Sequence, residues 1–174
     1  PRVSTLNRGL TAARLLESQH HLTLDGMIAV GYNKQLAAFE ILIPALINAF
    51  DKTIKPGDSM FTLLAEPVAL LKKWGYGMDT ASVAATLAIE WAERLPAALR
   101  NVYIDEGEKD QVQITKEFAA NATAAGLLQP LLQTIKDLQN RFGNWQVSWG
   151  MVNRYQRIDA DINPVYKDNE ESYP

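Results

Sequence analysis

Apolar residues recur three or four positions apart along most of the first 143 residues of this chain, with polar and charged residues between them. This spacing places apolar side chains on one face of a helix. The segment from Leu6 to Ser18 shows the pattern first. Thr23 is then a candidate N-cap for a short helix through Val30, because its hydroxyl can accept a hydrogen bond from a first-turn N–H. Gly31 is placed to end that helix.

The next two predicted helices are strongly apolar, and each contains a proline. The spacing from Gln35 to Phe50 predicts a helix with a bend or a break before Pro44, because proline removes a backbone donor and usually kinks a helix. Lys52 to Ser59 contains proline and glycine and is predicted to be a loop. Phe61 to Trp74 is predicted to be the second of these helices, ended by Gly75-Tyr76-Gly77.

Two further helical regions follow. Ser82 is placed to cap a helix from Val83 to Leu95. The stretch from Asn101 to Gln113 is polar and gives no clear prediction. Thr115 to Phe142 is predicted to be helical, with one interruption. That interruption is expected near Gly126 or Pro130.

The character of the sequence changes after Gly143, which is placed to stop the last long helix. Residues 144–174 are rich in aromatics, Asn, Asp and Arg and have no long helical period. We expect loops with short extended pieces there. The sequence therefore predicts a mainly α fold, with an irregular helical domain over residues 1–143 and a loop-rich C-terminal tail over residues 144–174.

Composition narrows the class of protein. Of the 174 residues, 47% are hydrophobic and 21% are charged, as in an ordinary soluble globular domain. The formal net charge of −3 comes without a basic cluster, which argues against nucleic-acid binding. No uninterrupted apolar run is long enough to span a membrane. The absence of Cys excludes disulfides, thiolate catalysis and Cys-ligated zinc, but it does not decide the cellular compartment.

Two groups of residues could suggest metal or acid–base chemistry. His20 and His21 are adjacent, so on a helix they would point about 100° apart and could not share a metal. We expect an exposed pair. The other group has the spacing of a calcium-binding loop, but Pro164 occupies the place where that loop needs a glycine in a sharp turn. We expect solvated carboxylates in this group, which consists of Asp159, Asp161, Asn163 and Glu170.

Four tryptophans could form a platform for a ligand. Trp74 and Trp91 lie in predicted apolar helix faces, where burial is the ordinary outcome. Trp145 and Trp149 are four residues apart beside Gly150 and are expected to form a corner packed on the core. No phosphate-binding loop and no helical zinc motif is present, so the residues predict a helical domain without a complete active site, and no cofactor or metal.

Several segments, taken in order, resemble the penicillin acylase family of N-terminal nucleophile hydrolases. Asn7-Arg8-Gly9-Leu10-Thr11-Ala12-Ala13-Arg14-Leu15-Leu16-Glu17 is similar to a family segment in which an Arg opens a helix that continues to Arg-Leu-Leu. Leu22-Thr23-Leu24-Asp25 is similar to the Leu-Thr-x-Asp that starts the next helix. Leu64-Ala65-Glu66-Pro67 and Leu70-Leu71-Lys72-Lys73-Trp74 resemble the helical stretch before a family Trp. Trp149-Gly150-Met151-Val152-Asn153-Arg154-Tyr155-Gln156-Arg157 resembles a Trp-Gly-acidic-x-Asn/His-Arg segment. The resemblance covers nearly the whole chain.

The resemblance implies an enzyme that hydrolyses the amide bond of a small acylated amine. In that family a precursor cuts itself, and the new N-terminal Ser of the β-chain attacks the carbonyl while its own α-amino group acts as base. An Asn side chain and a backbone N–H hold the oxyanion. The resemblance implies that this chain is an internal piece of the β-chain of a larger α+β hydrolase. Pro1 cannot be the nucleophile, so we expect the chain alone to be inactive.

One functional position of the family falls inside this chain. Arg8 matches the Arg that orients the oxyanion Asn and supports negative charge there, a role that suits a permanently charged guanidinium with several fixed donors. Arg154 and Arg157 are expected to form structural ion pairs. Met151 departs from the family pattern, which has an acidic residue at this place, so any ion pair of that acid is missing or replaced.

The implied partners are the α-chain, the rest of the β-chain and a small acyl-amide substrate, with no nucleic acid and no membrane. Because such enzymes in Gram-negative bacteria are commonly periplasmic, the resemblance also implies a periplasmic protein. The alternative is a stand-alone helical interaction or scaffold domain without catalysis. A piece of a larger enzyme should expose a large apolar patch where the missing chain packs, and this feature separates the two hypotheses.

Overall fold

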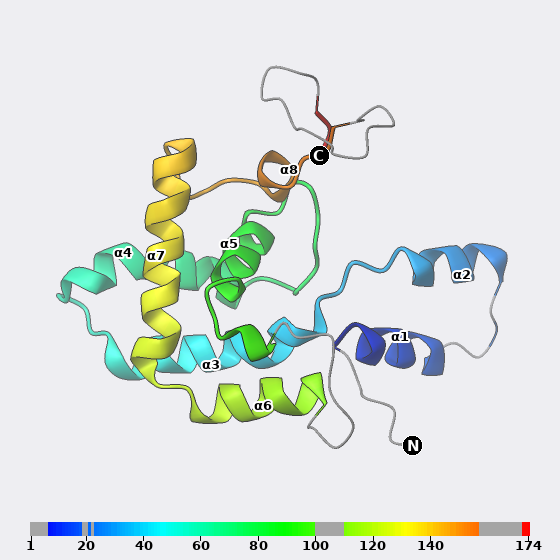
Figure 1. Cartoon of the computed structure of the whole chain (residues 1–174), viewed down its shortest axis with the longest axis horizontal. Coiled ribbons are helices and arrows are strands. Elements are labelled where there is room, and N and C mark those ends of the chain that lie inside the picture. The colour runs from blue at the N-terminus through cyan, green and yellow to red at the C-terminus, as the bar shows by residue number, and fades with distance from the viewer. Residues whose placement is uncertain (1–6, 19–20, 22, 100–109, 157–171) are drawn as a thin grey trace.

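The computed structural model of the chain describes residues 7–18, 21, 23–99, 110–156 and 172–174. Within these residues the fold is mainly helical, as predicted (Figure 1). The elements in chain order are α1 (Asn7–Glu17), α2 (Leu24–Gly31), α3 (Ala37–Thr53), α4 (Ser59–Lys72), α5 (Val83–Ala92), the 3-10 turn η1 (Ala97–Leu99), α6 (Gln111–Asn121), α7 (Ala124–Phe142) and α8 (Trp149–Val152).

Helix boundaries follow local capping signals. The Thr23 hydroxyl accepts a hydrogen bond from the Gly26 N–H at the start of α2, and the Ser82 hydroxyl accepts one from Ala85 at the start of α5. Both caps were predicted, and both satisfy a first-turn donor that has no partner within its helix. Gly143 ends α7 with φ of 74°, a left-handed conformation that glycine adopts without steric cost.

Of the bend or break predicted before Pro44, the break is absent. Pro44 lies inside α3, and the helix continues through it to Thr53. Proline removes one backbone hydrogen bond, but the side chains of Leu42, Ile43 and Leu46 around it are buried in the core, and this packing stabilises the helical conformation on both sides. The prolines inside α4 and α7 are accommodated in the same way.

Other boundaries also differ from the predictions. The interruption predicted within Thr115 to Phe142 lies at Ala122 and Thr123, just before Gly126. The Thr123 hydroxyl accepts a hydrogen bond from the Gly126 N–H and so caps a new helix, α7. Lys52 and Thr53, expected in a loop, complete α3. The stretch from Asn101 to Gln113 gave no clear prediction. Its residues up to 109 lie outside the described part of the chain, and Gln111 begins helix α6. The short helix α8 was not predicted.

Helix α3 is the centre of the packing. It contacts α6 and α7 most extensively, and α1 and α4 also pack against it. In Figure 1 the long helix α7 runs across α3 and α4, with α5 beside it. The core between these helices contains Trp91, whose side chain is fully buried and whose Nε1 donates a hydrogen bond to the Leu127 carbonyl at 3.0 Å. An indole N–H that is buried needs such a partner, so this bond fixes α5 against α7.

The start of the C-terminal tail is attached to the loop before α5. Backbone N–H groups of Trp149 and Gly150 donate to the carbonyls of Ser82 and Thr80 at 3.1 and 2.8 Å. Gly150 has no room for a side chain, because a Cβ there would lie 2.7 Å from the Pro174 Cβ and 3.1 Å from the Thr80 carbonyl oxygen. The glycine therefore permits close contact between α8, this loop and the chain end.

Replacing Gly150 with alanine is expected to destabilise the fold by about 1–3 kcal/mol, the usual effect of overpacking. Gly9→Ala is the matched control, because a Cβ at this position on α1 would meet nothing within 4 Å. That change should be neutral or stabilising by up to about 1 kcal/mol, since alanine is the better helix former. Urea denaturation followed by circular dichroism measures both. Equal midpoints for the two variants would contradict the close contact at Gly150.

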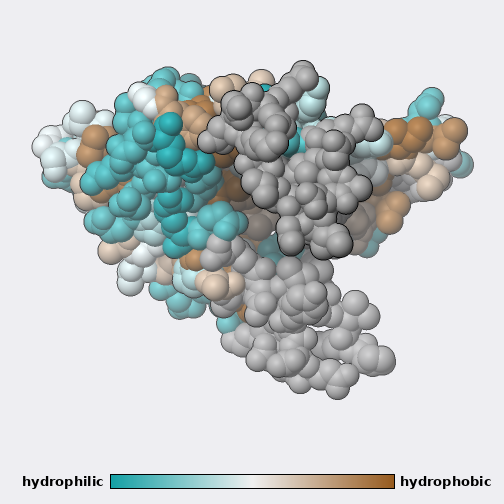
Figure 2. Space-filling view, turned by 45° about the horizontal axis from the view of Figure 1, so that its top comes forward, coloured by the Kyte–Doolittle hydropathy of each residue, from teal (hydrophilic) through white to brown (hydrophobic). Residues whose placement is uncertain are grey.

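Helix α2 is apolar but has no buried residue. Leu24 and Tyr32 are 76% and 80% exposed, and Met27 and Ile28 are also exposed. Figure 1 shows α2 beside α1 at one end of the molecule, away from α7, and Figure 2 shows hydrophobic residues on the surface at that end. Among the described residues, no helix is both long and apolar enough to cross a membrane.

Candidate functional site

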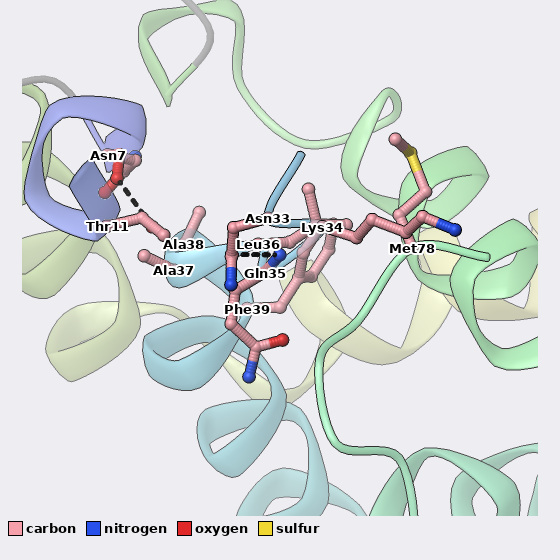
Figure 3. Close-up of a pocket in the computed structure, with 10 residues that line it drawn as sticks. All are labelled: Asn7, Thr11, Asn33, Lys34, Gln35, Leu36, Ala37, Ala38, Phe39 and Met78. Atoms are coloured by element: carbon pink, nitrogen blue, oxygen red, sulfur yellow. Dashed lines mark hydrogen bonds between the residues drawn. The ribbon is translucent and has the colours of Figure 1, made fainter. Parts of the chain in front are cut away.

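A pocket of about 440 Å³ lies between the start of α1, the start of α3 and the loop before α5. Its volume is within the range of about 300–1,000 Å³ that is common for small-molecule sites. Figure 3 shows Asn7 and Thr11 on α1 at one end, with Lys34 and Met78 at the other. Apolar residues form the wall between the two ends, and they are Leu36, Ala37, Ala38 and Phe39.

One wall of this pocket is held by pairing of two backbone segments. Gln35 and Gly77 form an isolated antiparallel bridge. The Leu36 N–H donates to the Tyr76 carbonyl, and the Met78 N–H donates to the Lys34 carbonyl, each at 2.9 Å. Tyr76 has a φ of 60°, a conformation that is uncommon for a residue with a side chain. The pairing on both sides of Tyr76 keeps it there, so residues 34–36 and Met78 are positioned before any ligand arrives.

Three aromatic rings pack behind this wall. The rings of Phe39 and Trp74 have centroids 5.3 Å apart, and those of Trp74 and Tyr76 are 5.6 Å apart, both in edge-to-face arrangements. Trp74 Nε1 donates to the Gly77 carbonyl at 2.9 Å. Edge-to-face pairs stabilise an aromatic cluster beyond simple burial, so Phe39 is a fixed part of the pocket wall.

The polar end of the pocket has a buried acceptor without a donor. The Asn7 backbone N–H donates to Gln111 Oε1 at 2.9 Å, and its side-chain Nδ2 donates to Thr115 Oγ1 at 3.3 Å. Asn7 Oδ1 is buried and has no hydrogen-bond partner among the residues that the structure describes. A buried acceptor in this state costs about 1–3 kcal/mol of folding free energy.

At the charged end of the pocket, the positive charge of Lys34 is offset by the carboxylate of Asp79. Lys34 Nζ lies 3.4 Å from Asp79 Oδ2, and both side chains are exposed. The Asp79 carboxylate also accepts a hydrogen bond from the Ala81 N–H at 2.9 Å. This backbone bond first, and Lys34 second, hold the pKa of Asp79 below its ordinary value, because both favour the charged carboxylate. The Asp79 carboxylate therefore stays ionised at neutral pH, and its charge offsets that of Lys34.

Comparison with known proteins decides the family. The model of the penicillin amidase family matches residues 2–168. The chain belongs to the penicillin amidase family. The match covers α1, with the pocket residues on it, and every other helix of the structure. No curated protein and no solved structure was found to match the chain. Membership of the penicillin amidase family supports an amidohydrolase role.

The predicted site residue Arg8 lies in the first turn of α1, next to Asn7 in the sequence. Its side chain is outside the part of the chain that the structure describes, so its role in a penicillin amidase stays a prediction. Arg154 donates hydrogen bonds to the Ser172 hydroxyl and to the Ser172 and Gly150 carbonyls, and these join α8 to residues 172–174. Arg157 lies outside the described residues.

Where the structure describes them, the histidines and tryptophans considered as candidate site residues are exposed or packed into the fold. His21 is exposed, and His20 lies outside the described residues. Trp91 is fully buried as expected, whereas Trp74 is partly buried in the loop after α4. Trp145 and Trp149 are partly buried, and Trp145 packs against the core. The acidic group with calcium-loop spacing also lies outside the described residues and consists of Asp159, Asp161, Asn163 and Glu170. In the part that is described, no cluster of three His, Asp or Glu could hold a metal ion.

Sequence reasoning missed the pocket itself. Asn7 was noted only as part of a family segment, and Gln35 and Met78 were not singled out. Asn7 meets Thr115 across 108 positions of the sequence, and Gln35 pairs with Gly77 across 42. Nothing in the local pattern around these residues indicates such contacts, because helical periodicity reports only which face of a helix is apolar.

Proposed function

We propose that this chain is part of an amidohydrolase that cleaves the amide bond of a small acylated amine. The observation that carries the proposal is the match to the penicillin amidase family over residues 2–168. In the proposed mechanism, an N-terminal Ser on another polypeptide segment attacks the carbonyl, and its α-amino group accepts the proton. Arg8 would orient the Asn that stabilises the oxyanion, and this assignment rests on the resemblance of residues 7–17 to the family segment.

The exposed apolar side chains of α2 support the proposal that another polypeptide segment packs against this chain. A helix of eight residues is too short to be stable in water by itself, so it normally needs tertiary packing. The exposed side chains of Leu24, Met27, Ile28 and Tyr32 offer such a contact surface. We propose that the remainder of the hydrolase covers this surface. On the same family resemblance, we propose that the enzyme acts in the periplasm.

The test begins with the natural reading frame from which this sequence comes. That protein is expressed, its mature chains are identified by mass spectrometry and N-terminal sequencing, and it is assayed with N-acyl p-nitroanilides of graded acyl length. We expect self-cleavage that creates an N-terminal Ser, hydrolysis of at least one anilide, and no hydrolysis by residues 1–174 alone.

Two results would contradict the proposal. Hydrolysis by residues 1–174 alone would show that the nucleophile lies within them. A natural protein that is folded but hydrolyses no anilide and has no N-terminal Ser would favour the alternative, a helical interaction or scaffold domain without catalysis. Replacing the N-terminal Ser with alanine is the control, because it should abolish hydrolysis while leaving the thermal midpoint nearly unchanged.

A further inference from the structure

Two further pockets adjoin each other along helix α4, and neither shares a residue with the pocket between α1 and α3. The larger, of about 460 Å³, lies beside the end of α4 and the start of α5. The smaller, of about 360 Å³, lies between α4 and α7. Glu66 and Trp145 line both, so the two pockets form one surface depression, which we call the α4 groove. Apolar side chains supply much of its wall, and they are Leu63, Pro67, Leu70, Val83 and Ile135.

The two pockets follow each other at nearly the spacing of alternate side chains in an extended peptide. On α4 and its end, the smaller pocket is lined by Thr62, Leu63, Glu66 and Pro67, and the larger by Glu66, Ala69, Leu70 and Lys73. These sets are centred about five positions apart, which is about 7.5 Å at a helix rise of about 1.5 Å per residue. In an extended peptide, side chains at positions i and i+2 point to the same side and lie about 6.6 Å apart. One extended segment can therefore place an apolar side chain in each pocket.

The two residues that the pockets share offer an acceptor and a donor for a peptide backbone. Glu66 Oε1 accepts a hydrogen bond from Gln146 Nε2 at 2.7 Å. The second carboxylate oxygen of Glu66 and the Trp145 Nε1–H have no hydrogen-bond partner among the described residues. A peptide carries an N–H and a C=O at each residue, so it can satisfy both groups. A hydrocarbon ligand has neither group, and a small carboxylate would be repelled by Glu66.

The charges along the groove favour an acidic segment. Lys73 lines the larger pocket and Lys136 the smaller, and both side chains are exposed. Neither ammonium group forms an ion pair with a described residue, whereas the neighbouring Lys72 is paired with Asp51. Two cations against the one carboxylate of Glu66 leave a positive charge on the groove. At physiological salt this charge attracts acidic side chains that lie within about 8 Å of it.

We infer that the α4 groove binds an extended segment of a partner protein, with apolar side chains at positions i and i+2 and acidic residues next to them. The apolar side chains occupy the two pockets, and the acidic residues lie near Lys73 and Lys136. The backbone between them bonds to Glu66 and to Trp145 Nε1. Backbone hydrogen bonds combined with pockets for alternate side chains are a common way to recognise an extended peptide. No residue of the groove has a part in the proposed hydrolysis, so binding here and hydrolysis are tested separately.

Binding is tested on the chain itself with three synthetic peptides that are acetylated and amidated at their ends. The first, Asp-Phe-Thr-Leu-Asp, has the inferred pattern. The second, Asp-Thr-Phe-Leu-Asp, has the same composition, but its two apolar side chains are adjacent and point to opposite sides when the peptide is extended. The third, Lys-Phe-Thr-Leu-Lys, keeps the apolar pattern and reverses the charge.

In ¹⁵N-labelled protein, the indole N–H of Trp145 and the side-chain amide of Gln146 report on the groove. We expect saturable shifts of both signals with the first peptide. The second should bind about tenfold more weakly, because it can bury only one apolar side chain. The third should bind about fivefold more weakly, because exposed charges contribute little individually, and this difference should shrink in high salt.

Two pairs of variants at exposed positions separate the contributions. Lys73→Glu should weaken binding of the first peptide and strengthen that of the third. Its control is Lys116→Glu, because Lys116 is exposed on α6 and lines neither pocket. Leu63→Ala should weaken the first peptide about threefold, since Leu63 lines the smaller pocket and is 47% exposed. Its control is Met151→Ala, which replaces an exposed side chain on α8 that lines neither pocket.

Equal binding of the first and second peptides would overturn the inference, because the spacing of the pockets would then have no effect. So would the absence of saturable shifts at Trp145 and Gln146, or equal responses of Lys73→Glu and Lys116→Glu. Shifts of the same signals on raising the protein concentration alone would assign the groove to a contact between copies of this chain and reject the partner segment.

Discussion

Replacing Trp91 with alanine is expected to lower the free energy of unfolding by about 3–5 kcal/mol, the range seen when a large aromatic residue is removed from a core. The Trp91 side chain is fully buried, and its Nε1 binds the Leu127 carbonyl across the α5–α7 contact. The variant therefore leaves a cavity where two helices meet and removes a hydrogen bond that joins them. Chemical denaturation followed by far-ultraviolet circular dichroism measures the change.

The matched control for this prediction is Trp145→Ala. Trp145 is only partly buried and packs on the edge of the core, so its removal leaves a site that water can fill. We expect a smaller loss than for Trp91. Trp91→Phe should fall between the two, because it keeps an aromatic ring but loses the bond to Leu127. A loss below about 1 kcal/mol for Trp91→Ala would contradict the central place of this side chain in the core.

Replacing Arg8 with alanine in the proposed amidohydrolase is expected to lower kcat/KM by up to about 10²–10³, the effect of losing the oxyanion donor whose orientation Arg8 would fix. In the proposed function Arg8 acts through the oxyanion Asn, so it is a positioning residue. The loss should appear mainly in kcat, because the oxyanion forms only as the reaction proceeds. Arg8→Lys should recover little, since an ammonium does not reproduce the planar donors of a guanidinium.

The control for Arg8 lies on the same helix. Arg14 Nη1 lies 2.7 Å from Glu40 Oε2, and the Arg14 side chain is 53% exposed. An exposed pair of this kind contributes about 1 kcal/mol or less, so Arg14→Ala should change neither stability nor kcat/KM greatly. Equal losses of activity in the Arg8 and Arg14 variants would show an effect through α1 as a whole. Unchanged kcat in Arg8→Ala would reject the positioning role.

Local chemistry made several parts of the fold predictable. The Thr23 and Ser82 caps and the Gly143 stop each depend on a side chain or a conformation within three residues of the helix end, and the structure has all three. The helix does not break at Pro44, because burial of the neighbouring residues outweighs one missing backbone hydrogen bond. The sequence also carries family membership, since the order of several segments resembles the penicillin acylases, and the family match confirms it.

The sequence by itself therefore determined the helical class, most helix starts and the family, because these depend on periodicity, caps and the linear order of residues. Only the tertiary structure decided where the unsatisfied acceptor and the apolar surface lie. Asn7 meets Gln111 and Thr115 of α6 only after α1 and α6 have packed around α3. The exposure of α2 likewise depends on what surrounds it, because the same apolar pattern would be expected of a helix buried in a core.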